Sequence, residues 1–404
     1  MRTLFSGAQV FDSRTGALAE ADVTVEDGRI VEVGTGLDGD EAVDVAGRAL
    51  LPGLFDCHTH VMISHIDMWK LVQQPFSYMF YVAEKNLEAT LGIGITTVRD
   101  AGGADLGVKQ AVEEGLILGP RMQISIGMLS QTGGHGDAWM PSGTHVPLFP
   151  DWPGSPSTLV DGAEEIRRKV RELIRDGADV IKVATTGGVL SARDDPRHAH
   201  FSEDELEMLV TEATAAGRWV MAHAQGSEGI KRAIRAGIRS IDHGIYLDDE
   251  AISLMLERGT YLVPTLVAPT GVITAAEAGA SIPEASIRKA KEVIEIHRES
   301  FRRAAEAGVK VAMGTDSGVT PHGENLRELE LMAEGGMTPA QALIATTAVA
   351  AELMGLERDL GTLEAGKRAD IVVVDGDPLE LKTLAERIEA VYKDGARVID
   401  RAAS

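Results

Sequence analysis

Residues 50–63 read LLPGLFDCHTHVMI, an apolar run that opens with Pro52-Gly53 and carries His58 and His60. Its composition is that of a buried strand, in which two imidazoles need an explanation. Side chains alternate along a strand, so His58 and His60 point to the same face. Two imidazoles on one face can hold one cation, although a hydrogen-bonded structural role is the alternative for either residue. The stretch predicts a buried strand that ends in a metal-binding pair.

Composition places the chain among soluble globular proteins. It has 404 residues, 44% of them hydrophobic, and a mean hydropathy close to zero. It contains no apolar run of eighteen residues, and its first residues lack the apolar segment and cleavage site of a secretory signal. The single cysteine, Cys57, agrees with a reducing compartment. We therefore expect a cytoplasmic protein.

The charge balance is strongly acidic. The chain carries 62 Asp and Glu against 39 Lys and Arg, a formal net charge of −23. Such a charge repels nucleic acid phosphates and anionic membranes. We expect a small-molecule substrate and neither a nucleic acid nor a membrane partner.

Both ends of the chain show short runs of alternating apolar and polar residues. Hairpin signals occur at Glu26-Asp27-Gly28 and at Asp394-Gly395. Neither end is long enough to bury a core alone. We expect residues 1–51 and 356–404 to combine into one small β-sandwich domain.

Residues 52–355 alternate apolar, strand-like runs with amphipathic stretches, the pattern of βα units with parallel strands. This rhythm predicts an α/β fold with a (β/α)₈ barrel, and no dinucleotide fingerprint supports an open doubly wound sheet. The expected strands cover residues 53–58, 95–101, 121–128, 179–185, 219–224, 240–244, 260–266 and 309–316. The expected helices include residues 158–176, 202–216, 228–236, 248–258 and 284–307.

Ionisable residues are concentrated at or near the carboxyl ends of the expected strands, where a barrel places its active site. They are His58, His60, Lys182, His223, His243 and Asp316. Imidazole favours zinc, while carboxylate oxygens leave manganese, cobalt or iron open. The pattern predicts a site for divalent cations.

Lys182 interrupts the apolar sequence DVIKVAT. An unpaired ammonium is costly in such a strand, and a salt bridge is one solution. Burial also lowers the pKa of a lysine, which frees the amine to add carbon dioxide. The product, N6-carboxylysine, is an anion that can bridge two cations. With Asp316 and one hydroxide it would offset three of their four positive charges, which favours hydroxide over water.

Taken together, the motifs resemble those of the amidohydrolase superfamily. They are PGLFDCHTH (52–60), VIKVA around Lys182, AHA (222–224), IDHG (241–244), GTDSG (314–318) and GTLEAGKRADIVVVDGDP (361–378). The chain looks most like the branch of Xaa-Pro dipeptidases and metal-dependent carboxypeptidases, which is related to imidazolonepropionase.

The resemblance implies a distorted barrel, a split β-sandwich domain and a binuclear centre. It implies that His58 and His60 bind the more buried cation with Asp316, that His223 and His243 bind the second, and that carboxylated Lys182 joins them. It also makes a homo-oligomer the expectation.

The implied reaction is hydrolysis of an amide bond by a metal-bridging hydroxide, with Asp316 carrying the proton to the departing amine. His135 and Tyr246 are candidate donors to the oxyanion, with a structural hydrogen bond as the alternative for each. We expect dipeptides of the Xaa-Pro type or N-acyl amino acids as substrates.

Other residues have weaker signals. His198 and His200 form a second H-x-H pair in a polar loop. Candidates for lining the cleft, holding a substrate carboxylate or forming an apolar lid are His322, Arg193, Arg197, Trp139, Phe149 and Trp152. The long connections 131–157 and 186–201 carry most of them.

Three alternatives stay open. A cyclic-amide hydrolase or deaminase is one, although a mononuclear deaminase would not need Lys182. A hydrolase of xenobiotic amides, ureas or carbamates would use identical chemistry. A non-enzymatic scaffold conflicts with the presence of all six candidate ligands.

Overall fold

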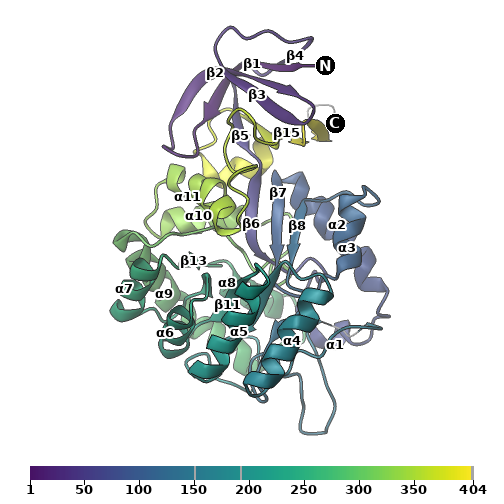
Figure 1. Cartoon of the computed structure of the whole chain (residues 1–404), viewed down its shortest axis with the longest axis vertical. Coiled ribbons are helices and arrows are strands. Elements are labelled where there is room, and N and C mark those ends of the chain that lie inside the picture. The colour runs from purple at the N-terminus through teal and green to yellow at the C-terminus, as the bar shows by residue number, and fades with distance from the viewer. Residues whose placement is uncertain (150–151, 192, 402–404) are drawn as a thin grey trace.

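The computed structural model describes residues 1–149, 152–191 and 193–401. Helices surround parallel strands in the larger part of the molecule, and a sheet that contains both chain ends lies above them (Figure 1). The purple N-terminal strands and the yellow C-terminal strands are neighbours in this sheet.

The two ends of the chain build one eight-stranded sheet, in which β14 pairs antiparallel with β5. Strands from the two ends of the chain therefore lie in one hydrogen-bonded sheet. A separate sandwich domain with boundaries near residues 51 and 356 stays a prediction. The strands are β1 (Thr3–Phe11), β2 (Leu18–Glu26), β3 (Arg29–Gly34), β4 (Glu41–Asp44), β5 (Arg48–Pro52), β14 (Ile371–Asp375), β15 (Ile388–Lys393) and β16 (Ala396–Asp400).

The central strands β5 and β14 of this terminal sheet are buried on both faces. Leu50 and Val373 pack into a core of its own with Phe5. Their sequence neighbours Leu51 and Val372 belong to the main core that the parallel strands share. Alternation along each strand therefore fastens the sheet to the rest of the molecule.

The parallel strands form two sheets in the order β6-β7-β8 and β13-β12-β11-β10-β9. The expected strand 121–128 is divided, because Ile126 has a φ of 67° and breaks the extended backbone. The strands are β6 (Leu54–Thr59), β7 (Ile95–Asp100), β8 (Arg121–Ile124), β9 (Met128–Leu129), β10 (Val180–Ala184), β11 (Trp219–Ala224), β12 (Ser240–His243) and β13 (Tyr261–Val263).

The expected strand 309–316 is not a regular strand. It forms an isolated bridge to β13 at Val311, and Cys57 of β6 donates its N–H to Met313 O at 2.9 Å. A continuous ladder is prevented because Thr315 N donates to the Asp56 side chain and Met313 N donates to Ala345 O. The segment thus connects the edges of the two parallel sheets by irregular hydrogen bonds, and a closed eight-stranded barrel remains an interpretation.

Four of the expected helices match within one residue at each end. The expected helix 158–176 begins late, at Ala163, because Gly162 has a φ of 82°. Ser202 and Glu205 form a capping box on α5, and Asp248 caps α7 by accepting from Ala251 N. The helices are α1 (Met68–Leu71), α2 (Tyr78–Gly92), α3 (Leu106–Glu113), α4 (Ala163–Arg175), α5 (Glu203–Ala215), α6 (Ser227–Ala236), α7 (Asp249–Arg258), α8 (Ala268–Glu277), α9 (Glu284–Ala307), α10 (Arg327–Glu334), α11 (Pro339–Ala345), α12 (Ala348–Leu353) and the 3₁₀ helix η1 (Leu381–Arg387).

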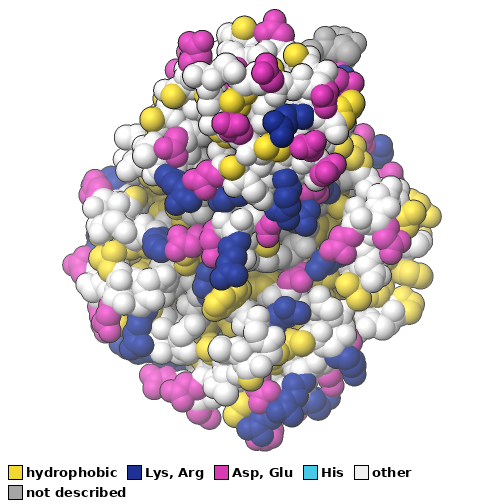
Figure 2. All heavy atoms as spheres, turned by 45° about the horizontal axis from the view of Figure 1, so that its top comes forward, with side chains coloured by type: hydrophobic (Ala, Val, Ile, Leu, Met, Phe, Trp, Pro, Cys, Tyr) yellow, Lys and Arg dark blue, Asp and Glu magenta, His cyan; other side chains and the backbone are white. Residues whose placement is uncertain are grey.

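The surface carries its acidic side chains mixed with basic ones. Figure 2 shows magenta and blue groups interspersed over one face, and many are ion pairs, such as Arg14 with Glu364 and Arg29 with Asp359. No helix in the described ranges is both long enough and apolar enough to cross a membrane.

Arg121 joins the terminal sheet to β8. Its guanidinium donates to Asp370 at 2.8 Å and to Asp394 at 3.0 Å. Because Asp370 is almost fully buried, Arg121→Met should lower the free energy of unfolding by about 2–4 kcal/mol, measured by urea denaturation. Arg14→Met, which breaks an exposed pair, is the control and should change it far less. Equal effects would contradict this role for Arg121.

Candidate metal centre

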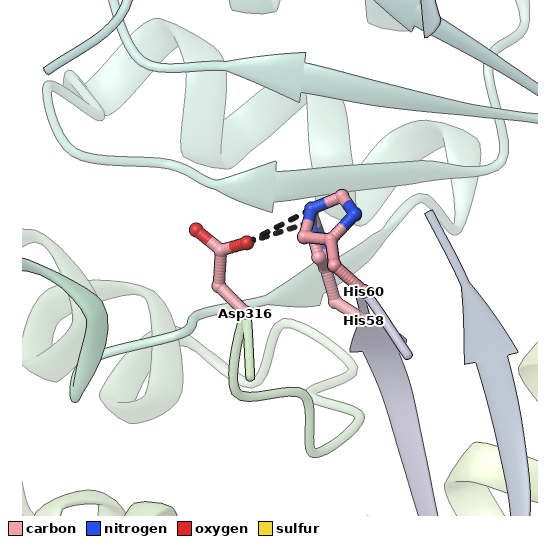
Figure 3. Close-up of side chains that lie close together, drawn as sticks. All are labelled: His58, His60 and Asp316. Atoms are coloured by element: carbon pink, nitrogen blue, oxygen red, sulfur yellow. Dashed lines mark ion pairs between the residues drawn. The ribbon is translucent and has the colours of Figure 1, made fainter. Parts of the chain in front are cut away.

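His58, His60 and Asp316 converge at one point of the structure. The two histidines come from β6 and the residue that follows it, while Asp316 is the last residue of the irregular segment 309–316 (Figure 3). Asp316 Oδ1 lies 3.4 Å from His58 Nε2 and 3.1 Å from His60 Nε2. Their ligand atoms lie within 4.8 Å of one another. Two imidazole nitrogens and a carboxylate oxygen fit a zinc-like cation.

The second ring nitrogen of each imidazole is held by a protein group. His58 Nδ1 lies 2.7 Å from Asp242 Oδ2, and His60 Nδ1 lies 2.9 Å from Gly102 O. His243 Nδ1 lies 2.7 Å from Thr265 Oγ1. Such partners fix the ring orientation and leave Nε2 available as a ligand atom.

His223 and His243 extend the cluster. Their ring centroids are 4.6 Å apart, and the His243 ring is 5.0 Å from that of His58. Burial holds the pKa of both His223 and His243 well below the usual range, so both rings are neutral, the form that binds a cation.

Lys182 in β10 is 1% exposed and faces the same cavity. Burial lowers the pKa of its ammonium. Its Nζ lies 3.4 Å from Asp242 Oδ2, so the salt bridge that the sequence left open is present here.

Asp242 connects these groups. Besides His58 and Lys182, it accepts from Arg99 Nη2 at 3.4 Å. Burial by itself would raise the pKa of Asp242, but the charges of Lys182 and Arg99 outweigh it and hold that pKa below its usual range. Asp242 was not predicted from the sequence. The signal was available, because a carboxylate in the apolar run SIDHG needs a partner as much as Lys182 does.

Backbone conformation brings both Asp242 and His243 to the centre. Adjacent residues of a strand normally point to opposite faces. His243, at the end of β12, has a φ of 78°, and Asp316 likewise has a φ of 62°. Non-glycine residues rarely adopt this region, and such strain is concentrated at functional sites.

The structure brings all six candidate ligands to one cavity. Its remaining wall is mainly apolar. The cavity-lining residues are His58, His60, Met128, His135, Leu148, Phe149, Lys182, Val189, Leu190, His223, Gln225, His243, Ile245, Thr265, Ala268, Pro269, Val272, His297, Asp316 and Val319.

His135 lines the cavity and stacks on His223, with ring centroids 4.1 Å apart. Its Nδ1 lies 2.7 Å from Ser191 Oγ. Only glycine fits at Gly188, because a Cβ there would overlap the His135 ring. The connection that carries Gly188 and Ser191 is stabilised by Lys289 of α9, whose Nζ donates to Ser191 O at 2.7 Å.

Tyr246 does not line the cavity. It is half-buried, and its N–H donates to Gln225 O at 2.8 Å. Its role as an oxyanion donor therefore stays a prediction.

The weaker candidates mostly lie elsewhere. His322 Nε2 lies 3.2 Å from His60 O, so it contacts the backbone of a candidate ligand and does not line the cavity. Arg197 pairs with Asp195 at 2.6 Å, and neither Arg197 nor Arg193 lines the cavity. Phe149 does line it, with its ring 4.9 Å from His60.

The other weak candidates are not part of the cavity wall. Trp139 and Trp152 do not line it. Among the described residues, no cluster of three or more potential ligands includes His198 or His200.

Comparison with known proteins concerns the family and the fold of the chain. The amidohydrolase family model matches residues 49–398. Ochratoxinase from Aspergillus niger is 38% identical over 364 residues, covering 86% of this chain and 75% of that protein. A prolidase solved with N-methylphosphonate-L-proline is 38% identical, covers 99% of this chain and 100% of its own, and has a TM-score of 0.90. A Xaa-Pro dipeptidase solved with methionine in its active site is 33% identical, with 98% and 99% coverage and a TM-score of 0.89. The expected resemblance is confirmed.

Asp242→Asn should weaken cation binding, because asparagine cannot pair with Arg99 as an anion or hold the His58 imidazole with a negative charge. We expect the affinity for zinc to fall about 10- to 100-fold, measured by competition with a chelator. Asp38→Asn, at an exposed position, is the control. Unchanged zinc affinity in Asp242→Asn would refute the role of this carboxylate.

Glu328 supports the loop that carries Thr265. It accepts from Leu266 N at 2.7 Å and Val267 N at 2.9 Å, and burial raises the pKa of its carboxyl to about 8. The folded protein therefore holds a proton that the unfolded chain loses, so stability falls as pH rises from about 5 to about 8. The variant Glu328→Gln loses one acceptor, so its free energy of unfolding should be lower than that of the unchanged protein at about pH 5. This difference in free energy should narrow as pH rises, because only the unchanged protein loses stability through Glu328. Urea unfolding across this range measures it, and a pH-independent difference would contradict the raised pKa.

Proposed function

We propose that this chain, which belongs to the amidohydrolase family and is a hydrolase of carbon–nitrogen bonds, uses two divalent cations. It would cleave an amide bond in Xaa-Pro dipeptides or N-acyl amino acids. The observation that carries the proposal is the convergence of six buried or half-buried potential ligands on one cavity.

The ligands divide into two sets. His58, His60 and Asp316 would hold the first cation. His223 and His243 would hold the second, and Lys182 would join the two. The nitrogen-rich set favours zinc. When bound, the cations activate water and polarise the carbonyl of the substrate.

Lys182 would serve as N6-carboxylysine. Its neutral Nζ forms a bond to the carbon of carbon dioxide and releases one proton to solvent, which leaves a carbamate anion. Burial supports this step because it disfavours the ammonium form. The carbamate would also replace a cation beside Arg99 with an anion, which Arg99 compensates.

The side chains supply the remaining steps. The carboxylate of Asp316 accepts a proton from the attacking water and delivers it to the departing amine. His135, which lines the cavity, donates a hydrogen bond to the oxyanion. Tyr246 is a second candidate donor, which would have to move to reach the cavity.

The substrate class rests on two kinds of support. The relatives include a Xaa-Pro dipeptidase, a prolidase with a proline phosphonate and an ochratoxinase. The apolar wall, which includes Leu190, Pro269 and Val272, suits an apolar substituent next to the scissile bond. A cytoplasmic location and a homo-oligomeric state are parts of this proposal that follow from the sequence and from the family.

The proposal is tested with zinc-loaded protein and a panel of Xaa-Pro dipeptides and N-acyl amino acids, with imidazolonepropionate for comparison. We expect amino acid release, with Lys182→Ala and Asp316→Asn each lowering kcat at least about 100-fold, and His135→Ala lowering kcat while zinc content is kept. Intact-mass analysis should show one added carbon dioxide, lost in Lys182→Ala. Full activity of Lys182→Ala, or ammonia release without an amino acid product, would refute the proposal.

A further inference from the structure

Gln225 follows β11 and lines the cavity two residues beyond His223. It is only 4% exposed, and its Oε1 is buried without any hydrogen-bond partner among the described residues. A buried amide oxygen without a hydrogen-bond partner destabilises the folded state, so its presence in the wall of the cavity calls for a reason.

The backbone of Gln225 is firmly held while its side chain is not. Its N–H donates to Thr186 Oγ1 at 2.9 Å, and its carbonyl accepts from Tyr246 N at 2.8 Å. The backbone at Gln225 is therefore held by Thr186 and Tyr246, which follow β10 and β12, the strands on either side of β11. Its side chain starts from this fixed backbone, and its amide oxygen, which has no partner, is available to contact a ligand.

The charges around Gln225 limit what that ligand is. Among the residues that line the cavity, Lys182 and Asp316 alone carry a full charge of the Lys, Arg, Asp or Glu type, and the proposed function assigns both to the cations. The rest of the wall is mainly apolar and includes Val189, Leu190 and Ile245. An ionised substrate group placed there would have no partner, which is costly.

We propose that Gln225 is a substrate-contacting residue, which selects an uncharged hydrogen-bonding group, such as a second amide, on the acyl part of the substrate next to the scissile bond. The inference rests on the proposed function, in which His223 would hold the cation that polarises the scissile carbonyl, and Gln225 follows His223 by two residues. Of the two substrate classes proposed, it favours N-acyl amino acids over Xaa-Pro dipeptides, whose acyl part carries an ammonium group. The apolar wall then receives the rest of the acyl group.

Three N-acyl leucines of similar length separate the effects. N-acetylglycyl-leucine carries a second amide, N-pentanoyl-leucine carries an alkyl chain, and N-succinyl-leucine carries a carboxylate. For the zinc-loaded protein we expect kcat/KM to be about 3- to 10-fold higher for the amide than for the alkyl substrate, and lowest for the carboxylate. Gln225→Leu should lower kcat/KM about 3- to 10-fold for N-acetylglycyl-leucine and less than about 2-fold for N-pentanoyl-leucine.

Binding gives a readout that does not depend on turnover. Calorimetric titration of the zinc-loaded protein with N-acetylglycine and pentanoate should show that Gln225→Leu weakens binding of N-acetylglycine alone. Binding that depends on Gln225 without any hydrolysis would support this inference and refute the proposed function. The inference would be overturned if Gln225→Leu changed neither kcat/KM for N-acetylglycyl-leucine nor the affinity for N-acetylglycine. It would also be overturned if neither N-acetylglycine nor pentanoate bound.

Thermal unfolding separates contact with substrate from a structural role. Because the amide of Gln225 has no partner, Gln225→Leu should leave Tm unchanged or raise it. The matched control is Gln123→Leu, which removes a hydrogen bond of 2.9 Å from Nε2 to Met354 O and should lower Tm. A fall in Tm of Gln225→Leu as large as that of the control would show a structural role and overturn the inference.

Discussion

The site depends on one buried carboxylate, that of Asp242. It is fully buried, and it contacts His58 of β6, Lys182 of β10 and Arg99 of β7. Arg99 also donates from Nε to Cys57 O at 2.6 Å, next to His58 in the chain. The side chains of Lys182, Arg99 and His58 therefore share the single negative charge of Asp242. Removing that charge would leave positive charge uncompensated in the interior. The same carboxylate orients His58, a candidate ligand, and sets the charge around Lys182. A change at Asp242 would therefore affect both the stability of the fold and the chemistry of the site.

Backbone strain at two neighbouring ligands follows from this arrangement. Asp242 occupies the inward position of β12, so His243 reaches the cavity only through its left-handed conformation. The next residue, Gly244, donates to Ala224 O at 3.0 Å, and Asp316 N donates to His58 O at 2.7 Å. These bonds hold conformations that an isolated chain would avoid. The surrounding strands therefore supply the energy that keeps the ligands in place.

The sequence predicted what depends on local pattern and missed what depends on tertiary contacts. Alternation and strand-end position pointed to His58 and His60, because a parallel fold gathers its strand ends. Lys182 stood out for another reason, as a charge that interrupts an apolar strand. The segment 309–316 looks like a strand, yet its backbone groups bond to Asp56 and to α11, which no local pattern reveals. Tyr246 sits beside a ligand in sequence, but its side chain does not line the cavity. Gln225 carried no signal at all, since an orphan amide is visible only once its neighbours are known.

Apolar side chains that stabilise the fold and polar side chains of the candidate site lie in different parts of the molecule. The terminal sheet and the main core bury large apolar side chains such as Phe5, Leu51 and Phe301, which gives the fold a reserve of hydrophobic free energy. The cavity instead holds buried imidazoles, whose ring nitrogens need polar partners, and the amide oxygen of Gln225, which has none. Lys289, with Nζ bonded to the carbonyls of Gly188, Ser191 and Asp194, braces the loop over the cavity from α9 without entering it. Because Lys289 lies outside the cavity, it stabilises the segment that carries Val189 and Leu190 without itself contacting a bound substrate.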